Sequence, residues 1–261
     1  MENQQYHYTN YKPPSKNGSQ LIGSIKAEDL LVFGVDEVKS LTGWNKNRIH
    51  NTLSNLNKKG HIIRLKKNTY TLEKHFFENT FKVITESIKP SYISFWTALS
   101  SYGFTEQQVN VIQLISTKQF HDLEIRNVNV EISTFKPEKF FGYDEIQGAV
   151  IADKEKSLVD SLFMLQKCGG LDEYTKCLRN AYPELNKDRL LKYIVRFGNR
   201  SLISRMGFLL DTLELADEGL LNDIHEHGSK GYVLLDPDGN TIRSYNNRWK
   251  IKINRDMEGI L

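Results

Sequence analysis

The stretch VKSLTGWNKNRIHNTLSNLNKKGHIIRLKKNTYTL, residues 38–72, holds eight Lys and Arg side chains and no Asp or Glu. The whole chain has 35 Lys and Arg against 32 Asp and Glu. Without those eight, the remainder has 27 basic against 32 acidic side chains, so a basic segment is joined to an acidic body. This asymmetry favours a polyanionic ligand, most simply the backbone of a nucleic acid.

The apolar pattern of this stretch and its flanks predicts three helices and a hairpin. Asn45 is a suitable N-cap for the third helix, and Gly60 ends it. Lys67 and Asn68 form the predicted turn, because Asn tolerates the left-handed conformation of a tight hairpin. The predicted elements are helices over residues 21–33, 36–43 and 45–60 and strands over 61–66 and 69–72. Their order predicts a winged helix-turn-helix over residues 21–75.

The third helix divides into an apolar and a polar face. Ile49, Leu53 and Leu56 recur at helical spacing and are predicted to be buried. The polar face and the hairpin supply the candidate DNA-binding residues Lys46, Asn47, Arg48, His50, Asn51, Ser54, Asn55, Lys58, Arg64, Lys66 and Lys67. Side-chain chemistry predicts base contacts from the Asn and His residues and phosphate contacts from the Lys and Arg residues.

Two alternatives to DNA binding remain for this segment. Winged helices also serve as docking platforms for proteins, and a charged helix face is often merely solvated. The lack of any acidic residue favours DNA, because a solvated face normally mixes both signs of charge. Trp44 is predicted either to stack on the sugar-phosphate backbone or to cap the small core.

The rest of the chain predicts a flexible leader, a linking helix and a larger mixed body. Residues 1–20 are polar, and Pro13-Pro14 and Asn17-Gly18 interrupt regular structure. Residues 73–88 are predicted to form a helix with Phe77, Phe81 and Ile84 on one face. The winged helix is expected to end at residue 75 and Lys89-Pro90 to end the helix, so the linker covers residues 76–90. Residues 91–261 alternate between helical and strand patterns, so the expected fold class is α+β. The expected helices cover residues 92–102, 155–166, 171–181, 187–197 and 201–215, and the expected strands cover 109–116, 128–134, 148–152, 231–235 and 248–254.

Composition predicts a cytoplasmic protein that does not enter a membrane. No apolar run approaches the roughly 18 residues of a membrane span. The polar N-terminus has no apolar signal core. Cys168 and Cys177 lack partners for a metal site and are expected to be reduced and buried.

Four blocks of the sequence resemble the AbiEi-type antitoxins of abortive-infection systems. They are YISFWTALSSYGFTEQQ at residues 92–108, IADKEKSLVDSLFML at 151–165, RMGFLLDTL at 205–213 and RWKIKIN at 248–254. In the second block Glu155, Lys156, Leu158 and Asp160 match the family's helix, whereas Ser157 stands where the family usually has Ala. With the basic N-terminal segment, the resemblance extends from about residue 21 to the end.

The resemblance implies a DNA-binding antitoxin. Its winged helix would repress its own operon through operator DNA that carries inverted repeats. Its C-terminal domain would counteract a nucleotidyltransferase-type toxin without a stable complex. The alternatives are a stand-alone winged-helix regulator, a protein-interaction module with no toxin partner, and an enzyme that acts on nucleic acid.

No other segment predicts catalysis, a metal or a cofactor. The Gly-Ser pairs lack the acidic residues that a nucleotidyltransferase places after them. The sequence His225-Glu226-His227 directs its two imidazoles apart on a helix. The segment Asp236-Pro237-Asp238-Gly239-Asn240 lacks the acid at position 12 of a calcium loop, where Asn247 stands, and predicts a turn. The basic residues Arg196, Arg200 and Arg205 are a candidate second surface for nucleic acid or toxin, or simply solvated helix faces.

Overall fold

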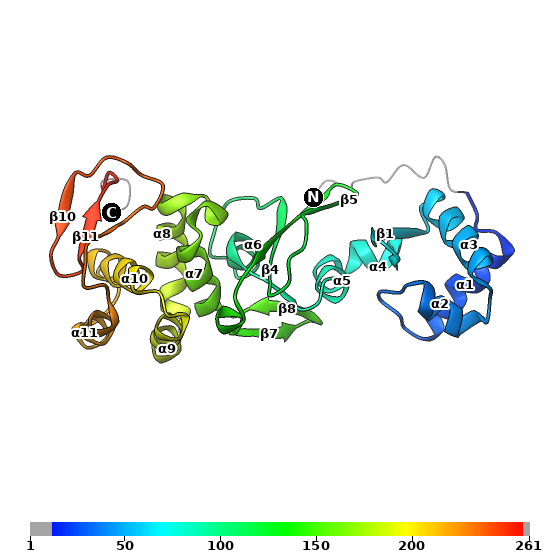
Figure 1. Ribbon diagram of the computed structural model, residues 1–261, viewed down its shortest axis with the longest axis horizontal. Helices are drawn as coiled ribbons and strands as arrows, with labels where there is room; N and C mark the ends of the chain where they lie inside the picture. The colour runs from blue at the N-terminus through cyan, green and yellow to red at the C-terminus, as the bar shows by residue number, and fades with distance from the viewer. Residues whose placement is uncertain (1–11, 258–261) are drawn as a thin grey trace. The chain divides into compact units, whose positions relative to one another are not determined.

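The computed structural model describes residues 12–257. The chain forms two compact units, Met1–Lys89 and Pro90–Leu261, which are described separately below (Figure 1). The architecture is mixed α+β, as expected from the sequence. No helix within residues 12–257 is long and apolar enough to cross a membrane.

The first unit begins with helix α1, Lys16–Ala27. The prediction of a flexible leader over residues 1–20 is therefore wrong for residues 16–20, and residues 1–11 lie outside the described part of the chain. Ser15 begins the helix, because its Oγ accepts the backbone N–H of Gly18 at 3.2 Å. The helix ends before the predicted Phe33, since Asp29 adopts a φ of 49°.

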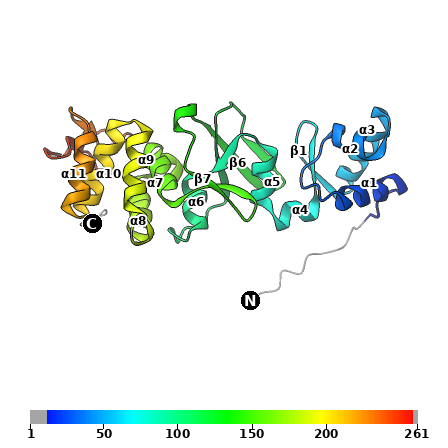
Figure 2. The ribbon, with the colours of Figure 1, turned by 90° about the horizontal axis from the view of Figure 1, so that it is seen from below.

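Helices α2, Val35–Thr42, and α3, Lys46–Lys58, lie where the sequence predicts them. Gly43 separates them in a left-handed conformation with φ 66°, which a glycine adopts without strain. In α3 Ile49, Leu53 and Leu56 point into the core of the first unit. Figure 2 shows the three helices beside the hairpin that follows.

The hairpin consists of β1, Ile62–Lys66, and β2, Thr69–Leu72, paired antiparallel. Asn68 has a φ of 57°, as the predicted turn requires. Phe33, between α1 and α2, extends this sheet: its N–H donates to the carbonyl of Tyr70 at 2.9 Å, and the N–H of Tyr70 donates back at 2.8 Å. The hairpin is thereby tied to the segment between the first two helices.

The predicted linking helix over residues 73–88 is divided in two. Helices α4, Glu73–Glu78, and α5, Thr80–Ser87, are separated by Asn79, whose ψ of 45° interrupts the helix. The break shifts the helical phase, so Phe76 is buried and Phe77 is 61% exposed. The prediction that Phe77 lies on one face with Phe81 and Ile84 is therefore wrong, since Ile84 is fully buried.

The second unit contains a six-stranded sheet with the order β5-β6-β4-β3-β8-β7. The strands are β3 (Ser91–Ile93), β4 (Val111–Ser116), β5 (Leu123–Ile125), β6 (Val128–Thr134), β7 (Tyr143–Ile146) and β8 (Ala149–Ala152). The strands expected over residues 109–116 and 128–134 are present as β4 and β6, and they pair in parallel. The prediction of a helix over 92–102 is wrong at its start, because Tyr92 and Ile93 pair with β4; helix α6 runs over Phe95–Ser101.

After the last strand of this sheet the chain forms helices, whose apolar side chains belong to the core of the second unit. They are α7 (Lys154–Phe163), α8 (Gly170–Ala181), α9 (Lys187–Phe197), α10 (Arg200–Thr212) and α11 (Glu218–His227), with 3-10 turns at Pro137–Lys139, Leu165–Cys168 and Tyr182–Glu184. The expected elements did not include α11, β5, β7 or the strand Ser244–Asn246 described next. Cys168 and Cys177 are free and buried.

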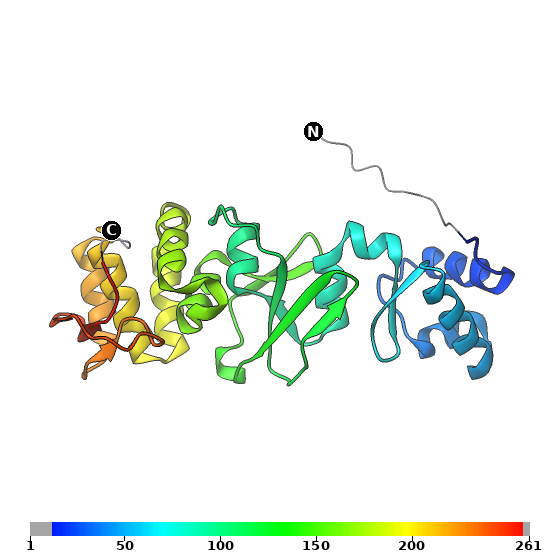
Figure 3. The same ribbon diagram turned by 90° about the horizontal axis from the view of Figure 1, so that it is seen from above.

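A small three-stranded sheet ends the unit. It has the order β10-β11-β9, formed by β9 (Val233–Leu234), β10 (Ser244–Asn246) and β11 (Ile251–Ile253). Figures 1 and 3 show it beside α10. Trp249, 1% exposed, is part of the core, and its indole N–H donates to the Asp211 carboxylate on α10 at 2.6 Å.

Candidate nucleic-acid interface

Helix α3 presents a continuous polar face. Its N-cap Asn45 accepts the backbone N–H of Arg48 at 2.9 Å, which fixes the start of the helix. Every residue predicted on this helix to contact DNA is exposed: Lys46, Asn47, Arg48, His50, Asn51, Ser54, Asn55 and Lys58. Helical spacing places Asn47, Asn51, Ser54 and Lys58 along the centre of the face, with the others on its two flanks.

One flank of α3 borders a hollow that contains carboxylates. The hollow, of about 450 Å³, is lined from α3 by Lys46 and His50. Asp36, Glu37 and Glu86 also line it. These carboxylates oppose a phosphate here, so the acid-free character of residues 38–72 does not extend to the surface around Lys46.

The other flank borders a hollow that no carboxylate lines. It measures about 420 Å³, and its lining residues are Ser15, Asn17, Arg48, Asn51, Thr52 and Asn55. Hydroxyl, amide and guanidinium groups of this kind bind phosphate and base edges. Ser15 and Asn17 were not predicted at this site because both were expected in the leader. A serine three residues before Gly18 and ahead of an apolar helix is typical of an N-cap, and it could have indicated the earlier helix start.

Arg48 is held in place by two neighbours in this hollow. Its guanidinium carbon lies 4.0 Å from the centroid of the Trp44 ring, and Nη2 donates to the side-chain oxygen of Asn17 at 2.8 Å. The Trp44 ring is 7% exposed and belongs to the core of the first unit. Of the two predicted roles of Trp44, capping of the core is the one observed, and the ring also orients Arg48.

The basic side chains of the hairpin differ in their exposure to solvent. Arg64 and Lys67 are exposed, whereas Lys66 is half-buried. Arg64 Nε donates to the carbonyl of Lys66 at 3.3 Å, next to an irregularity in the strand register. The tip of the hairpin therefore offers Lys67 to solvent in full.

Lys59, the C-cap of α3, makes a structural contact with the segment before α1. Its ammonium group donates to the carbonyl of Pro13 at 2.8 Å, and the ring of His61 bonds the carbonyl of Lys12 at 2.8 Å. These two bonds hold the segment before α1 against the end of α3. Lys12 and Lys16 are themselves exposed.

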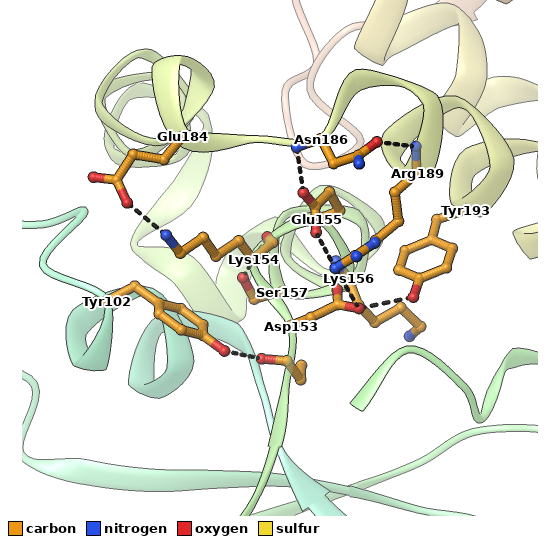
Figure 4. Close-up of polar contacts among 11 residues, drawn as sticks. Tyr102, Asp153, Lys154, Glu155, Lys156, Ser157, Glu184, Asn186, Arg189 and Tyr193 are labelled. Carbon is orange, nitrogen blue, oxygen red and sulfur yellow. Dashed lines mark hydrogen bonds and ion pairs between the residues drawn. The ribbon is translucent and has the colours of Figure 1, made fainter. Parts of the chain in front are cut away.

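A second polar cluster surrounds the start of α7 (Figure 4). Asp153 accepts the Lys156 backbone N–H at 2.8 Å and the Tyr193 hydroxyl at 2.7 Å. Burial and this hydrogen bond raise the pKa of Tyr193 to about 12. Glu155 accepts the backbone N–H of Asn186 at 2.6 Å. These acidic side chains join the start of α7 to α9.

Lys156 and Asp160 form an ion pair within the core. Both side chains are fully buried, and Asp160 also accepts the hydroxyls of Ser94 at 2.8 Å and Tyr92 at 3.1 Å. Burial lowers the pKa of Lys156 and raises that of Asp160, and the attraction between them opposes both shifts. Through the hydroxyls of Tyr92 and Ser94 the pair connects α7 to β3 and to the residue that follows it. Because both charged groups are closed to solvent, we assign the pair a structural role.

Several of the remaining candidates in the second unit make structural contacts, whereas Arg200 is exposed. His225 bonds the carbonyl of Arg248 at 2.9 Å, and residues 12–257 hold no group of His, Cys, Asp and Glu arranged for a metal ion. Asp236 forms the predicted turn by accepting the backbone N–H of Asp238 at 3.0 Å. Arg196 lies over Phe141 and Arg205 donates to the carbonyl of Leu234, so these two arginines contact different elements.

Comparisons with known proteins found a similar fold but no matching family. No protein-family model matches the chain, and no curated protein does. Among solved structures, the RV2827C protein from Mycobacterium tuberculosis is similar, with a TM-score of 0.66 and 12% sequence identity over 92% of each chain. At this identity the similarity establishes a shared fold along nearly the whole chain.

Proposed function

We propose that the first unit is a winged helix that binds double-stranded DNA, with α3 in the major groove and the β1–β2 hairpin as the wing. The observation that carries the proposal is the exposed polar face of α3, bordered on the Arg48 flank by a hollow without carboxylates. An α-helix fits the major groove of B-DNA, where base edges are distinguishable. The bridge between Phe33 and Tyr70 supports the wing.

The residues of this face divide into two roles. Asn47, Asn51 and Asn55 reach base edges, since an Asn amide can bond bidentately to adenine. Arg48 binds a phosphate, because its planar guanidinium is already oriented by Trp44. The lysines at positions 46, 58 and 67 add charge that positions the protein without specifying sequence.

We further propose that this binding represses the protein's own operon and that the second unit counteracts a nucleotidyltransferase-type toxin. The support for this step is the resemblance of residues 92–108 and 151–165 to AbiEi-type antitoxins. Two copies bound to inverted repeats would account for operator recognition, and neutralisation would need no stable complex with the toxin.

A reporter experiment in cells tests both steps. The upstream region is fused to a reporter gene, and the wild-type protein and Asn51→Ala are expressed in turn. The proposal predicts repression by the wild type and loss of repression in the variant. Toxin co-expression then separates the roles: the Asn51→Ala protein should still protect growth. Repression without any protection would identify a stand-alone regulator, and protection without repression would refute the DNA-binding step.

A further inference from the structure

The sheet β10-β11-β9 has one buried and one exposed face. Ile251 is fully buried beneath the sheet. Tyr245 pairs with Lys252, and Lys252 pairs with Leu234 on the other side. Because paired residues share a face and successive residues alternate, these three side chains lie on the face opposite Ile251. Tyr232, two residues before Leu234, continues the same face.

Two tyrosine rings stand exposed on this outer face. Tyr245 is 57% exposed and Tyr232 is 39% exposed. Their ring centroids are 5.4 Å apart at 87°, so one ring supports the other edge-to-face. Tyr232 is further fixed by a hydrogen bond from its hydroxyl to the Asn247 side chain. The Tyr245 ring is thereby supported and still open to solvent.

The segments that build this sheet are basic. Residues 239–255 contain five Lys and Arg and no Asp or Glu, and residues 228–235 contain Lys230 and no acid. The three arginines of the first segment form ion pairs with carboxylates of neighbouring elements. Lys230, Lys250 and Lys252 form no ion pair with any carboxylate of the described residues. Lys250 lies beside the rings, with Nζ 5.4 Å from the centroid of Tyr232.

We propose that this outer face binds single-stranded nucleic acid, with a base stacked on Tyr245 and phosphates bound by Lys230, Lys250 and Lys252. An aromatic ring on a sheet, flanked by unpaired lysines, complements an unstacked base and its backbone. A duplex does not fit, because its base faces are covered by neighbouring bases. The site lies in the second unit and is independent of the proposed role of α3.

The test measures fluorescence anisotropy of labelled oligouridine and oligothymidine, each of about twelve nucleotides, with the full chain. Unlabelled duplex from the upstream region is added to occupy α3. The proposal predicts that both oligonucleotides remain bound. Tyr245→Ala should weaken their binding about fivefold or more, whereas Tyr245→Phe retains the stacking ring and the affinity. The ratio of the two affinities shows whether the site prefers RNA or DNA.

Charge variants complete the experiment. Lys252→Ala should lower the salt slope by about 0.7, whereas Lys192→Ala, which removes an exposed lysine of α9, should not change it. The midpoint of chemical denaturation of Tyr245→Ala should equal that of the wild type, which shows that the variant is folded. The proposal is wrong if neither oligonucleotide binds, if Tyr245→Ala binds as the wild type does, or if the duplex displaces both oligonucleotides.

Discussion

Gly207 of α10 lies directly beneath the indole ring of Trp249. A Cβ built on Gly207 would be 2.0 Å from the nearest ring atom, a separation that real contacts never reach. The indole N–H is fixed one helical turn further on by the Asp211 carboxylate. Two blocks that are separated in sequence, residues 205–213 and 248–254, are thus in contact through one glycine and one tryptophan.

This contact predicts an unusual effect of a small substitution. Gly207→Ala should destabilise the protein by more than about 2 kcal/mol, because the ring has to move although Ala favours helices. Gly23→Ala, in α1 with open space around its Cβ, is the matched control and should stabilise by about 0.5–1 kcal/mol. Chemical denaturation measures both. Equal effects of the two variants would contradict the packing described for Trp249.

Asn51 lies at the centre of the α3 face, so its removal should reduce sequence discrimination. Asn51→Ala is expected to cost about 1–3 kcal/mol of preference for the operator over random DNA. The salt slope should stay the same because no charge is lost. Titration of both DNAs at several salt concentrations measures this. Unchanged discrimination would exclude a base contact by Asn51.

Lys67, at the tip of the hairpin, should act through charge alone. Lys67→Ala is expected to weaken binding to operator and random DNA alike and to reduce the salt slope by about one unit. Lys26→Ala, which removes an exposed lysine in the last turn of α1, is the control. If both variants have the same salt slope, the hairpin does not contact the DNA backbone.

The success of the sequence predictions depended on how local each signal was. Helix α3 was predicted because its cap, Asn45, and its apolar residues all belong to the helix itself. Strand β3 was missed because Tyr92 and Ile93 become a strand by pairing with β4, which lies some twenty residues away in the chain. The break at Asn79 has no Pro or Gly to mark it.

The same distinction applies to the candidate interface. The 3.6-residue period was enough to predict which α3 side chains are exposed. The residues that decide the electrostatics of its two flanks come from other elements: Asp36 and Glu86 on one side, Ser15 and Asn17 on the other. Their proximity to α3 depends on tertiary packing, which no local pattern in residues 38–72 contains.

The buried pair Lys156–Asp160 predicts a difference between single and double variants. Lys156→Met should destabilise by about 3–5 kcal/mol, because it leaves the Asp160 carboxylate buried without its cation. Adding Asp160→Leu removes that charge, so the double variant should regain most of the loss. Denaturation of the three proteins tests the prediction. A double variant as unstable as the single one would mean that packing, rather than charge, dominates here.

The burial of Tyr174 predicts how the stability of the protein changes at alkaline pH. Burial raises its pKa well above the ordinary value of 10.0. Between these values the unfolded chain loses the phenolic proton while the folded chain keeps it, so stability falls as the pH rises above about 10. The hydroxyl has one weak contact, Met206 Sδ at 3.8 Å. Tyr174→Phe should therefore change stability little at neutral pH and lose less above pH 10; an unchanged alkaline profile would contradict this.

The most direct test of the central claim is binding to the DNA immediately upstream of the gene, compared with scrambled DNA of equal length, over a salt series. If α3 recognises sequence, the upstream fragment should bind preferentially, with an affinity that falls steeply as salt increases. Equal and weak binding of both fragments would contradict it, because the face of α3 would then be a basic surface without sequence recognition.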